Sequence, residues 1–113
     1  MAESIFEIPA GSVADQIGMK LYQANAVKGQ WYTIPAGYKE VHIQAAFSNQ
    51  YATAISLLND GSSTTLSYMV GFGGGSGLNY TQVDFKASTG EIKIAGMYFN
   101  SNDVYGSASI WYK

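Results

Sequence analysis

Apolar and polar residues alternate in short runs along most of this chain, and the clearest run lies between Ile34 and Phe47. In an extended chain successive side chains point to opposite faces, so residues two apart share a face. His42 and Gln44 fall on one face of this run. The residues on the opposite face are Val41, Ile43, Ala45 and Phe47. The run IPAGYKEVHIQAAF therefore predicts a half-buried strand that the backbone enters through a Pro-Ala-Gly turn.

Other alternating runs predict further strands. A weak run lies at Ser4–Ile8, and Ser12–Lys20 is the one segment whose spacing permits a single helical turn. The other predicted strands are Met19–Ala24, Gly29–Ile34, Tyr51–Leu58, Thr64–Phe72, Asn79–Phe85, Glu91–Phe99 and Ser107–Lys113. About eight or nine short strands without a durable helix are typical of an all-β sandwich or small barrel. We expect an antiparallel β-sandwich of jelly-roll-like type.

Small and polar residues mark the connections between these runs. Asn59-Asp60-Gly61 predicts a hairpin, because Asp-Gly supplies the positive φ angles that match strand twist. Thr64–Phe72 would then pair with the strand before it. The glycine-rich segment Phe72–Gly77 predicts a long loop or a bulged edge. Asn100–Gly106 is the most polar segment and predicts a loop.

The composition limits the class of protein. With 113 residues the chain predicts one domain spanning residues 1–113, and its 47% hydrophobic and 12% charged residues exclude a disordered chain. The net charge is −2, and the six basic residues are scattered lysines with no arginine, so we expect no nucleic-acid partner. Without cysteine there is no disulfide and no thiolate metal site.

No targeting or membrane signal stands out in the sequence. No apolar run is long enough to cross a bilayer, so we expect no membrane insertion. The acidic start MAESIFE lacks the basic and apolar regions of a signal peptide, which predicts a chain that is not Sec-targeted. An initiator Met added to an excised domain is an equally good interpretation of this start.

Residues for catalysis or metal binding do not gather in the sequence. His42 is the only histidine and has no Gly-x-Ser-x-Gly partner, so we expect a structural or surface role for it. The carboxylates are dispersed, although folding could still bring together the two that a glycosidase needs. Gly71–Gly77 lacks the Lys-Ser/Thr and helix of a phosphate-binding loop. Asn100, Asn102 and Asp103 suit an Asx-rich turn better than a calcium site. We therefore expect no enzyme, no metal and no cofactor.

Aromatic residues next to amides and carboxylates give the best functional signal. The chain holds nine tyrosines and two tryptophans. Sugar recognition uses this pairing, because an aromatic ring stacks on the apolar side of a sugar while polar oxygens bind its hydroxyl groups. Core and subunit packing explain the same residues equally well in physical terms, since Tyr and Trp have apolar bodies and polar tips. The candidate ligand-binding residues are Trp31, Asn49, Tyr51, Asn102, Asp103 and Tyr105.

The order of these features resembles the small β-sandwich head domains at the receptor-binding tips of bacteriophage tail fibres and in related phage structural proteins. The resemblance lies in the sequence IPAGYKEVHI, in a charge-poor body rich in Gly, Ser and Thr, and in the final strand SASIWYK. It covers about residues 29–113. Residues 1–28 fit less well and are expected to form an extra strand or an upstream connector.

The resemblance implies a homotrimer that contacts a bacterial surface polysaccharide or outer protein, alongside other virion proteins. The expected location is the virion or the outside of the cell. Our first hypothesis is a non-enzymatic adhesion module that binds glycan. The alternatives are a purely structural virion or assembly protein, and a carbohydrate-active enzyme or lectin-like carbohydrate-binding module. The enzyme would use a pair of carboxylates that the sequence does not single out, and loss of turnover on changing Asp103 or Glu40 would favour it.

Overall fold

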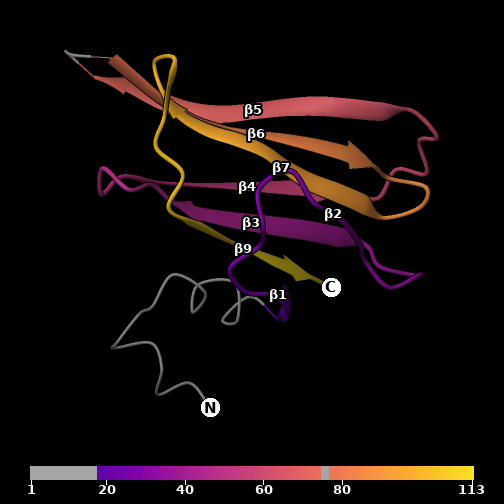
Figure 1. Cartoon of the computed structure of the whole chain (residues 1–113). Coiled ribbons are helices and arrows are strands. Elements are labelled where there is room, and N and C mark those ends of the chain that lie inside the picture. The colour runs from indigo at the N-terminus through magenta and orange to yellow at the C-terminus, as the bar shows by residue number, and fades with distance from the viewer. Residues whose placement is uncertain (1–17, 75–76) are drawn as a thin grey trace.

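The computed structural model describes residues 18–74 and 77–113, which form nine strands in two packed antiparallel sheets (Figure 1). This arrangement confirms the predicted all-β sandwich of eight or nine strands. The weak strand expected at Ser4–Ile8 lies outside the described residues, as does most of the helical turn expected at Ser12–Lys20. Lys20 itself begins the first strand.

One sheet has four strands and the other has five. The strands of the four-stranded sheet are, in spatial order, β1 (Lys20–Gln23), β9 (Ser107–Tyr112), β3 (Glu40–Ala46) and β4 (Ala52–Leu58). The strands of the five-stranded sheet are β2 (Trp31–Thr33), β7 (Glu91–Phe99), β6 (Gly77–Lys86) and β5 (Thr65–Gly74), with β8 (Asn102–Asp103) also paired to β7. Figure 1 shows the two sheets as stacked layers.

The strand β3 lies in the interior of its sheet, as the alternation of its sequence predicts. It pairs with β9 on one side and β4 on the other, and Val41, Ile43 and Ala45 are buried against the opposite sheet. From that sheet Val83, Phe85, Ile92, Ile94 and Met97 complete the core. Each fully buried large side chain of this kind contributes roughly 1.5–3 kcal/mol to folding, so this single layer of apolar contacts holds the two sheets together.

A buried tyrosine fastens the entrance to β3. The predicted Pro-Ala-Gly turn is present, with Gly37 at φ 86°, and it delivers Tyr38 into the core. The Tyr38 hydroxyl donates a 2.6 Å hydrogen bond to the carbonyl oxygen of Ala87, and its ring lies edge-on to Phe85. Burial raises the pKa of Tyr38 to about 12, with the charge of Asp60 acting in the same direction.

The hairpin predicted at Asp60-Gly61 is wrong. β4 pairs with β3 and β5 pairs with β6, so the chain passes from one sheet to the other between these strands. The turn chemistry is nevertheless used: Gly61 has φ 77°, and the Asn59 side chain accepts a hydrogen bond from the Gly61 amide. Asp-Gly therefore bends the chain here, but Leu57 of β4 is buried in the core and the chain continues into β5, which pairs with β6 of the other sheet.

The loop predicted over Phe72–Gly77 is also wrong for most of its length. Backbone pairing continues through Phe72 and Gly73 to the pair Gly74 and Gly77, so the glycines extend two ten-residue strands to their connection. Gly71 permits this close pairing, because a Cβ atom there would meet the backbone and Cβ of Tyr80 at less than 3 Å. The predicted polar loop at Asn100–Gly106 contains the short strand β8.

We predict that Tyr38→Phe lowers the free energy of unfolding by about 1–3 kcal/mol, because the buried Ala87 carbonyl would lose its donor. Urea denaturation followed by circular dichroism measures this. The control is Tyr68→Phe, since Tyr68 packs near the same Phe85 ring but its hydroxyl has no hydrogen bond within residues 18–74 and 77–113. Equal losses in the two variants would contradict the role of the hydroxyl.

Candidate functional site

A row of interacting side chains crosses the outer face of the five-stranded sheet. Trp31 of β2 is the register partner of Lys93 of β7, whose Nζ lies 4.8 Å from the centre of the indole ring. Lys93 Nζ also lies 3.5 Å from Oδ2 of Asp84 on β6. Ser67 Oγ of β5 donates a 2.6 Å hydrogen bond to Oδ1 of the same carboxylate. The row places a half-exposed indole beside a fixed ammonium and a fixed carboxylate.

Two tyrosines form a second part of this face. Tyr80 of β6 and Tyr98 of β7 are register partners, with ring centres 5.3 Å apart and planes inclined by 35°. The ring of Tyr98 lies over Gly96, because a Cβ atom at that position would overlap Cε2, Cζ and the hydroxyl oxygen of Tyr98. A ring that lies on the sheet in this way turns its other face away from the protein, which is the orientation that stacking on a ligand needs.

A β-bulge explains why Tyr98 points outward. Ile92 and Ile94 are buried, so strict alternation would also turn residue 98 toward the core. The register shifts between Gln82 and Val83, where Ile94 and Gly96 face consecutive residues of β6. Ala95 is the extra residue between these two pairs, and it shifts the alternation of β7 by one position. Met97 is therefore buried in the core, and Tyr98 lies on the outer face.

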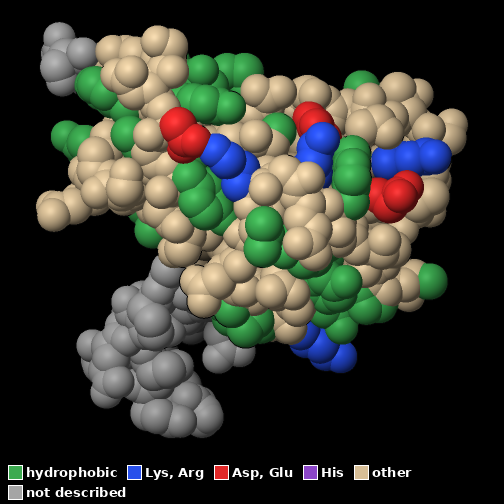
Figure 2. All heavy atoms as spheres, in the orientation of Figure 1, with side chains coloured by type: hydrophobic (Ala, Val, Ile, Leu, Met, Phe, Trp, Pro, Cys, Tyr) green, Lys and Arg blue, Asp and Glu red, His purple; other side chains and the backbone are tan. Residues whose placement is uncertain are grey.

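An ion pair closes the end of this face near β8. Asp103 is the register partner of Tyr98, and its Oδ2 bonds Nζ of Lys28. The hydrogen bond from Lys28, followed by the one from the Tyr105 amide, lowers the pKa of Asp103, and the bond to Asp103 raises the pKa of Lys28. Figure 2 shows acidic and basic side chains side by side in a band, with hydrophobic side chains between them.

We call this surface the aromatic face and define it by Trp31, Tyr80, Asp84, Lys93, Tyr98 and Asp103. Gln82 and Met69, which are register partners, lie between its two parts. The surface combines one exposed ring, Trp31, and two partly buried rings, Tyr80 and Tyr98, with carboxylate, amide and ammonium groups. It can therefore stack on flat apolar surfaces and hydrogen-bond to hydroxyl groups around them.

The structure places the six predicted ligand-binding residues in more than one location. Trp31 and Asp103 belong to the aromatic face, and Asn102 is exposed beside it in β8. The Tyr105 hydroxyl bonds the Ala26 carbonyl and so ties the β7–β9 connection to the β1–β2 connection. Burial raises the pKa of Tyr105.

Asn49 and Tyr51 lie in the turn between β3 and β4. Asn49 exchanges two amide hydrogen bonds with Asn79, at 3.3 and 3.1 Å, and Asn79 is almost fully buried. This reciprocal pair joins the turn to β6, so the Asn49 amide has a structural role. Tyr51 is about half exposed.

The functional candidates that sequence analysis missed are Tyr80, Asp84, Lys93 and Tyr98. Asp84 and Lys93 are ordinary charged positions until the β6–β7 register sets them side by side. Tyr98 has one usable signal, which is the glycine two residues before it. Such a glycine on the same face of a strand leaves room for an aromatic ring to lie down on the sheet.

His42 lies on the outer face of the other sheet, as the alternation of β3 predicts, but it is only 8% exposed. Its Nδ1 is 2.7 Å from Ser56 Oγ, while its Nε2 has no hydrogen-bond partner among residues 18–74 and 77–113. A serine–histidine pair acts in nucleophilic catalysis when a third group orients the histidine through its other nitrogen. That orienting contact is missing within the described part of the chain, so the geometry supports a structural role for His42.

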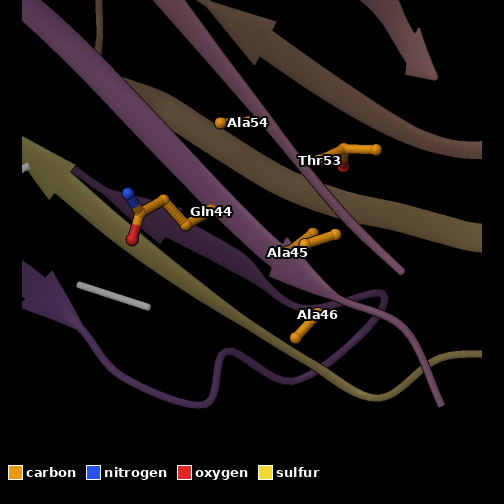
Figure 3. A pocket seen from close by; sticks show the side chains of 6 residues that line it. Gln44, Ala45, Ala46, Thr53 and Ala54 are labelled. Atoms are coloured by element: carbon orange, nitrogen blue, oxygen red, sulfur yellow. The ribbon is translucent and has the colours of Figure 1, made fainter. Parts of the chain in front are cut away.

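A shallow hollow of about 280 Å³ lies against β3 and β4 (Figure 3). It is lined by Gln44, Ala45, Ala46, Ala52, Thr53 and Ala54. Figure 3 shows that Gln44 is the longest side chain there. Binding sites for polar ligands usually converge several polar groups, and alanines supply none. The aromatic face is therefore the better candidate site.

No family model, curated protein or solved structure matches this chain. Across residues 18–74 and 77–113, no group of three His, Asp or Glu side chains is placed to hold a metal ion. The same residues contain no helix long and apolar enough to span a membrane.

We predict that the stability of this protein falls as the pH drops below about 6.5, the ordinary pKa of histidine. Burial lowers the pKa of His42 in the folded state, although Glu40 opposes this. The unfolded chain therefore binds the proton more readily, so His42 stabilises the fold fully above the unfolded pKa and progressively less below it. Thermal unfolding between about pH 7.5 and about pH 5.5 measures this decline before most carboxylates titrate.

The matched variant is His42→Gln, which removes the titrating group but keeps a polar side chain next to Ser56. Its melting temperature should change less over the same pH range than that of the natural sequence. An unchanged slope would contradict the assignment to His42.

Proposed function

We propose that this protein is a non-enzymatic adhesion module of a phage virion that binds carbohydrate on a bacterial surface through its aromatic face. The observation that carries the proposal is the ring of Tyr98, which lies over Gly96 next to Tyr80. Nothing in the core requires this arrangement, because both rings are on the outside of the sheet. An orientation that leaves ring faces available suits stacking on sugars.

The polar groups around the rings match the other half of a sugar. Pyranose rings have apolar C–H surfaces bordered by hydroxyl groups that need donors and acceptors. Asp84 and Asp103 supply carboxylate oxygens, and a carboxylate has about four acceptor sites, so each retains capacity beyond its internal bonds. Lys93 supplies a donor that Trp31 and Asp84 hold in place.

The shape of the site favours a chain of sugars over a single small ligand. The aromatic face follows β6 and β7 along the sheet, so an extended polysaccharide can contact both of its parts. Each contact would be weak. Linked sites on a homotrimer can increase the overall affinity about 10²–10⁴-fold without any new contact, which is how such a module would hold a cell surface.

The second candidate function is a structural virion protein without a ligand. Half-exposed aromatic rings also occur at subunit interfaces, because Tyr and Trp are enriched there. The specific observation in its favour is that Trp31, at 44% exposed, lies on the short strand β2 at the edge of its sheet, where a neighbouring virion protein has access.

We predict that Trp31→Ala and Tyr98→Ala each weaken saturable binding to bacterial surface polysaccharides on a glycan array by about 2–10-fold, with the fold intact by circular dichroism. Each variant removes the ring on which a sugar would stack, and contacts between aromatic rings, taken here as a guide, contribute about 0.5–1.5 kcal/mol each. The control is Val27→Ala, since Val27 is exposed in the β1–β2 connection outside the aromatic face.

Absence of saturable binding by the natural sequence to any bacterial polysaccharide on the array would overturn the proposed function. Affinity that is unchanged in both aromatic variants would place the sugar elsewhere on the molecule.

A subtler variant tests the orientation of Tyr98. We predict that Gly96→Ala weakens glycan binding at least several-fold while the fold persists, because the new methyl group would occupy the space under the ring and lift it. The overlapping atoms are at the far end of the Tyr98 side chain, which can move, and the backbone at Gly96 is not in the positive-φ region. Isothermal titration with a polysaccharide that binds the natural sequence measures the change, and equal affinity in both proteins would show that the ring orientation is irrelevant.

A further inference from the structure

One flank of the sandwich is formed by the edge strands of both sheets. β4 is the last strand of the four-stranded sheet and β5 the last strand of the five-stranded sheet, and the chain passes directly from one to the other. We call this side the β4–β5 flank and define it by these two strands. Each of them has one row of backbone N–H and C=O groups that no strand among the described residues pairs.

The opposite flank, formed by β1 and β2, is closed by aromatic side chains. Tyr22 lies edge-on to Tyr32 across the two sheets, with ring centres 6.4 Å apart, and edge-on to Tyr112 at 6.3 Å. Near the β4–β5 flank the two sheets are joined by a 2.9 Å hydrogen bond between Thr53 of β4 and Thr81 of β6 and by the Asn49–Asn79 pair, but among the described residues no aromatic rings meet between β4 and β5. Aromatic side chains thus cover the core on the β1–β2 flank, whereas the β4–β5 flank lacks such a cover among the described residues.

The β4–β5 flank has no charged side chain. The sequences ATAISLL of β4 and TLSYMVGFGG of β5 contain no Asp, Glu, Lys, Arg or Pro. Soluble proteins usually protect exposed edge strands with charges, prolines, bulges or a covering segment, because a free edge pairs readily with another chain. Every charged side chain among the described residues belongs to another element or connection.

The flank contains the most exposed large hydrophobic side chains of the described strands. Leu58 of β4 is 69% exposed and Met69 of β5 is 61% exposed, the two highest values for large hydrophobic residues in the described chain. Leu66 is 43% exposed although its register partner Phe85 is buried in the core. Ile55 and Tyr68 face inward and are only partly covered. The core is therefore open on this side.

We propose that the β4–β5 flank is the surface through which copies of this chain associate. A surface without charges can meet its own copy without like-charge repulsion, and a neighbouring copy brings edge strands that can pair with the free backbone groups. The proposed function includes a homotrimer, and this inference names the surface through which its copies would contact one another. It rests on the proposed function only for the expected number of three copies.

The size of the flank fits a second copy. A ten-residue strand is about 33 Å long, and two sheets about 10 Å apart with their outer side chains give a strip roughly 20 Å wide, or about 650 Å². Stable protein interfaces bury about 800 Å² per partner, so the flank supplies most of the area that one neighbouring copy needs. In a cyclic assembly the β5 edge of one copy can lie against the β4 edge of the next, which repeats around the axis until the ring closes.

The test is the mass of the full chain in solution by size-exclusion chromatography with multi-angle light scattering. We expect three times the 12.1 kDa chain mass for the natural sequence. Leu66→Lys and, separately, Leu58→Lys should shift it to the monomer mass, because each places a charge in the contact. Leu58 is exposed to solvent in the single chain, so Leu58→Lys should fold. It therefore tests the contact even if Leu66→Lys fails to fold.

The matched control is Val27→Lys, which puts the same charge on an exposed hydrophobic position of the opposite flank and should leave the mass unchanged. A monomeric natural sequence overturns the inference, as does an oligomer that survives both flank variants. A dimer that both flank variants dissociate supports the flank and removes the trimer from the proposed function. If the natural sequence associates but binds no glycan on the array, the adhesion role is overturned and the flank inference stands.

Discussion

The period of two along each strand is the constraint on which this structure depends. Once Val41 and Ile43 of β3 pack against Val83, Ile92 and Ile94 of the other sheet, every second side chain is committed to the core. The remaining side chains have to lie on the outer faces. The aromatic face is what this division leaves outside on β2, β6 and β7. The functional surface and the core are therefore two sides of the same strands, and neither can be changed without regard to the other.

Local irregularities decide which aromatic residues reach the surface. The bulge in β7 moves Met97 inward and Tyr98 outward, and Gly96 gives the Tyr98 ring a place to lie. Asp84, which interacts with Lys93 and Ser67, ties the same face together across three strands. A regular β7 would have put Tyr98 into the core. The site thus depends on one extra residue in one strand.

The sequence predicts the fold better than it predicts the site. Alternation identified β3, whose apolar face is uninterrupted, and the first part of β7, where Ile92 and Ile94 share a buried face. It could not show whether Asp60-Gly61 joins two paired strands or carries the chain between sheets, since the turn has the same local chemistry in both cases. Sequence neighbours such as Asn49 and Tyr105 looked available for ligands, but long-range hydrogen bonds to Asn79 and Ala26 occupy them. Such partners lie 30 and 79 residues away, beyond the reach of any local pattern.

The two tryptophans give the most direct test of the central claim that carbohydrate binds to the aromatic face. Trp31 lies on that face, while Trp111 is almost buried in the other sheet. Their indole N–H signals can be followed separately by ¹H–¹⁵N NMR during titration with a bacterial surface polysaccharide fragment. The account predicts a saturable shift of the Trp31 indole and of the Gly96 amide, with Trp111 unchanged. A saturable shift of Trp111 without Trp31, or no shift at either indole, would contradict it.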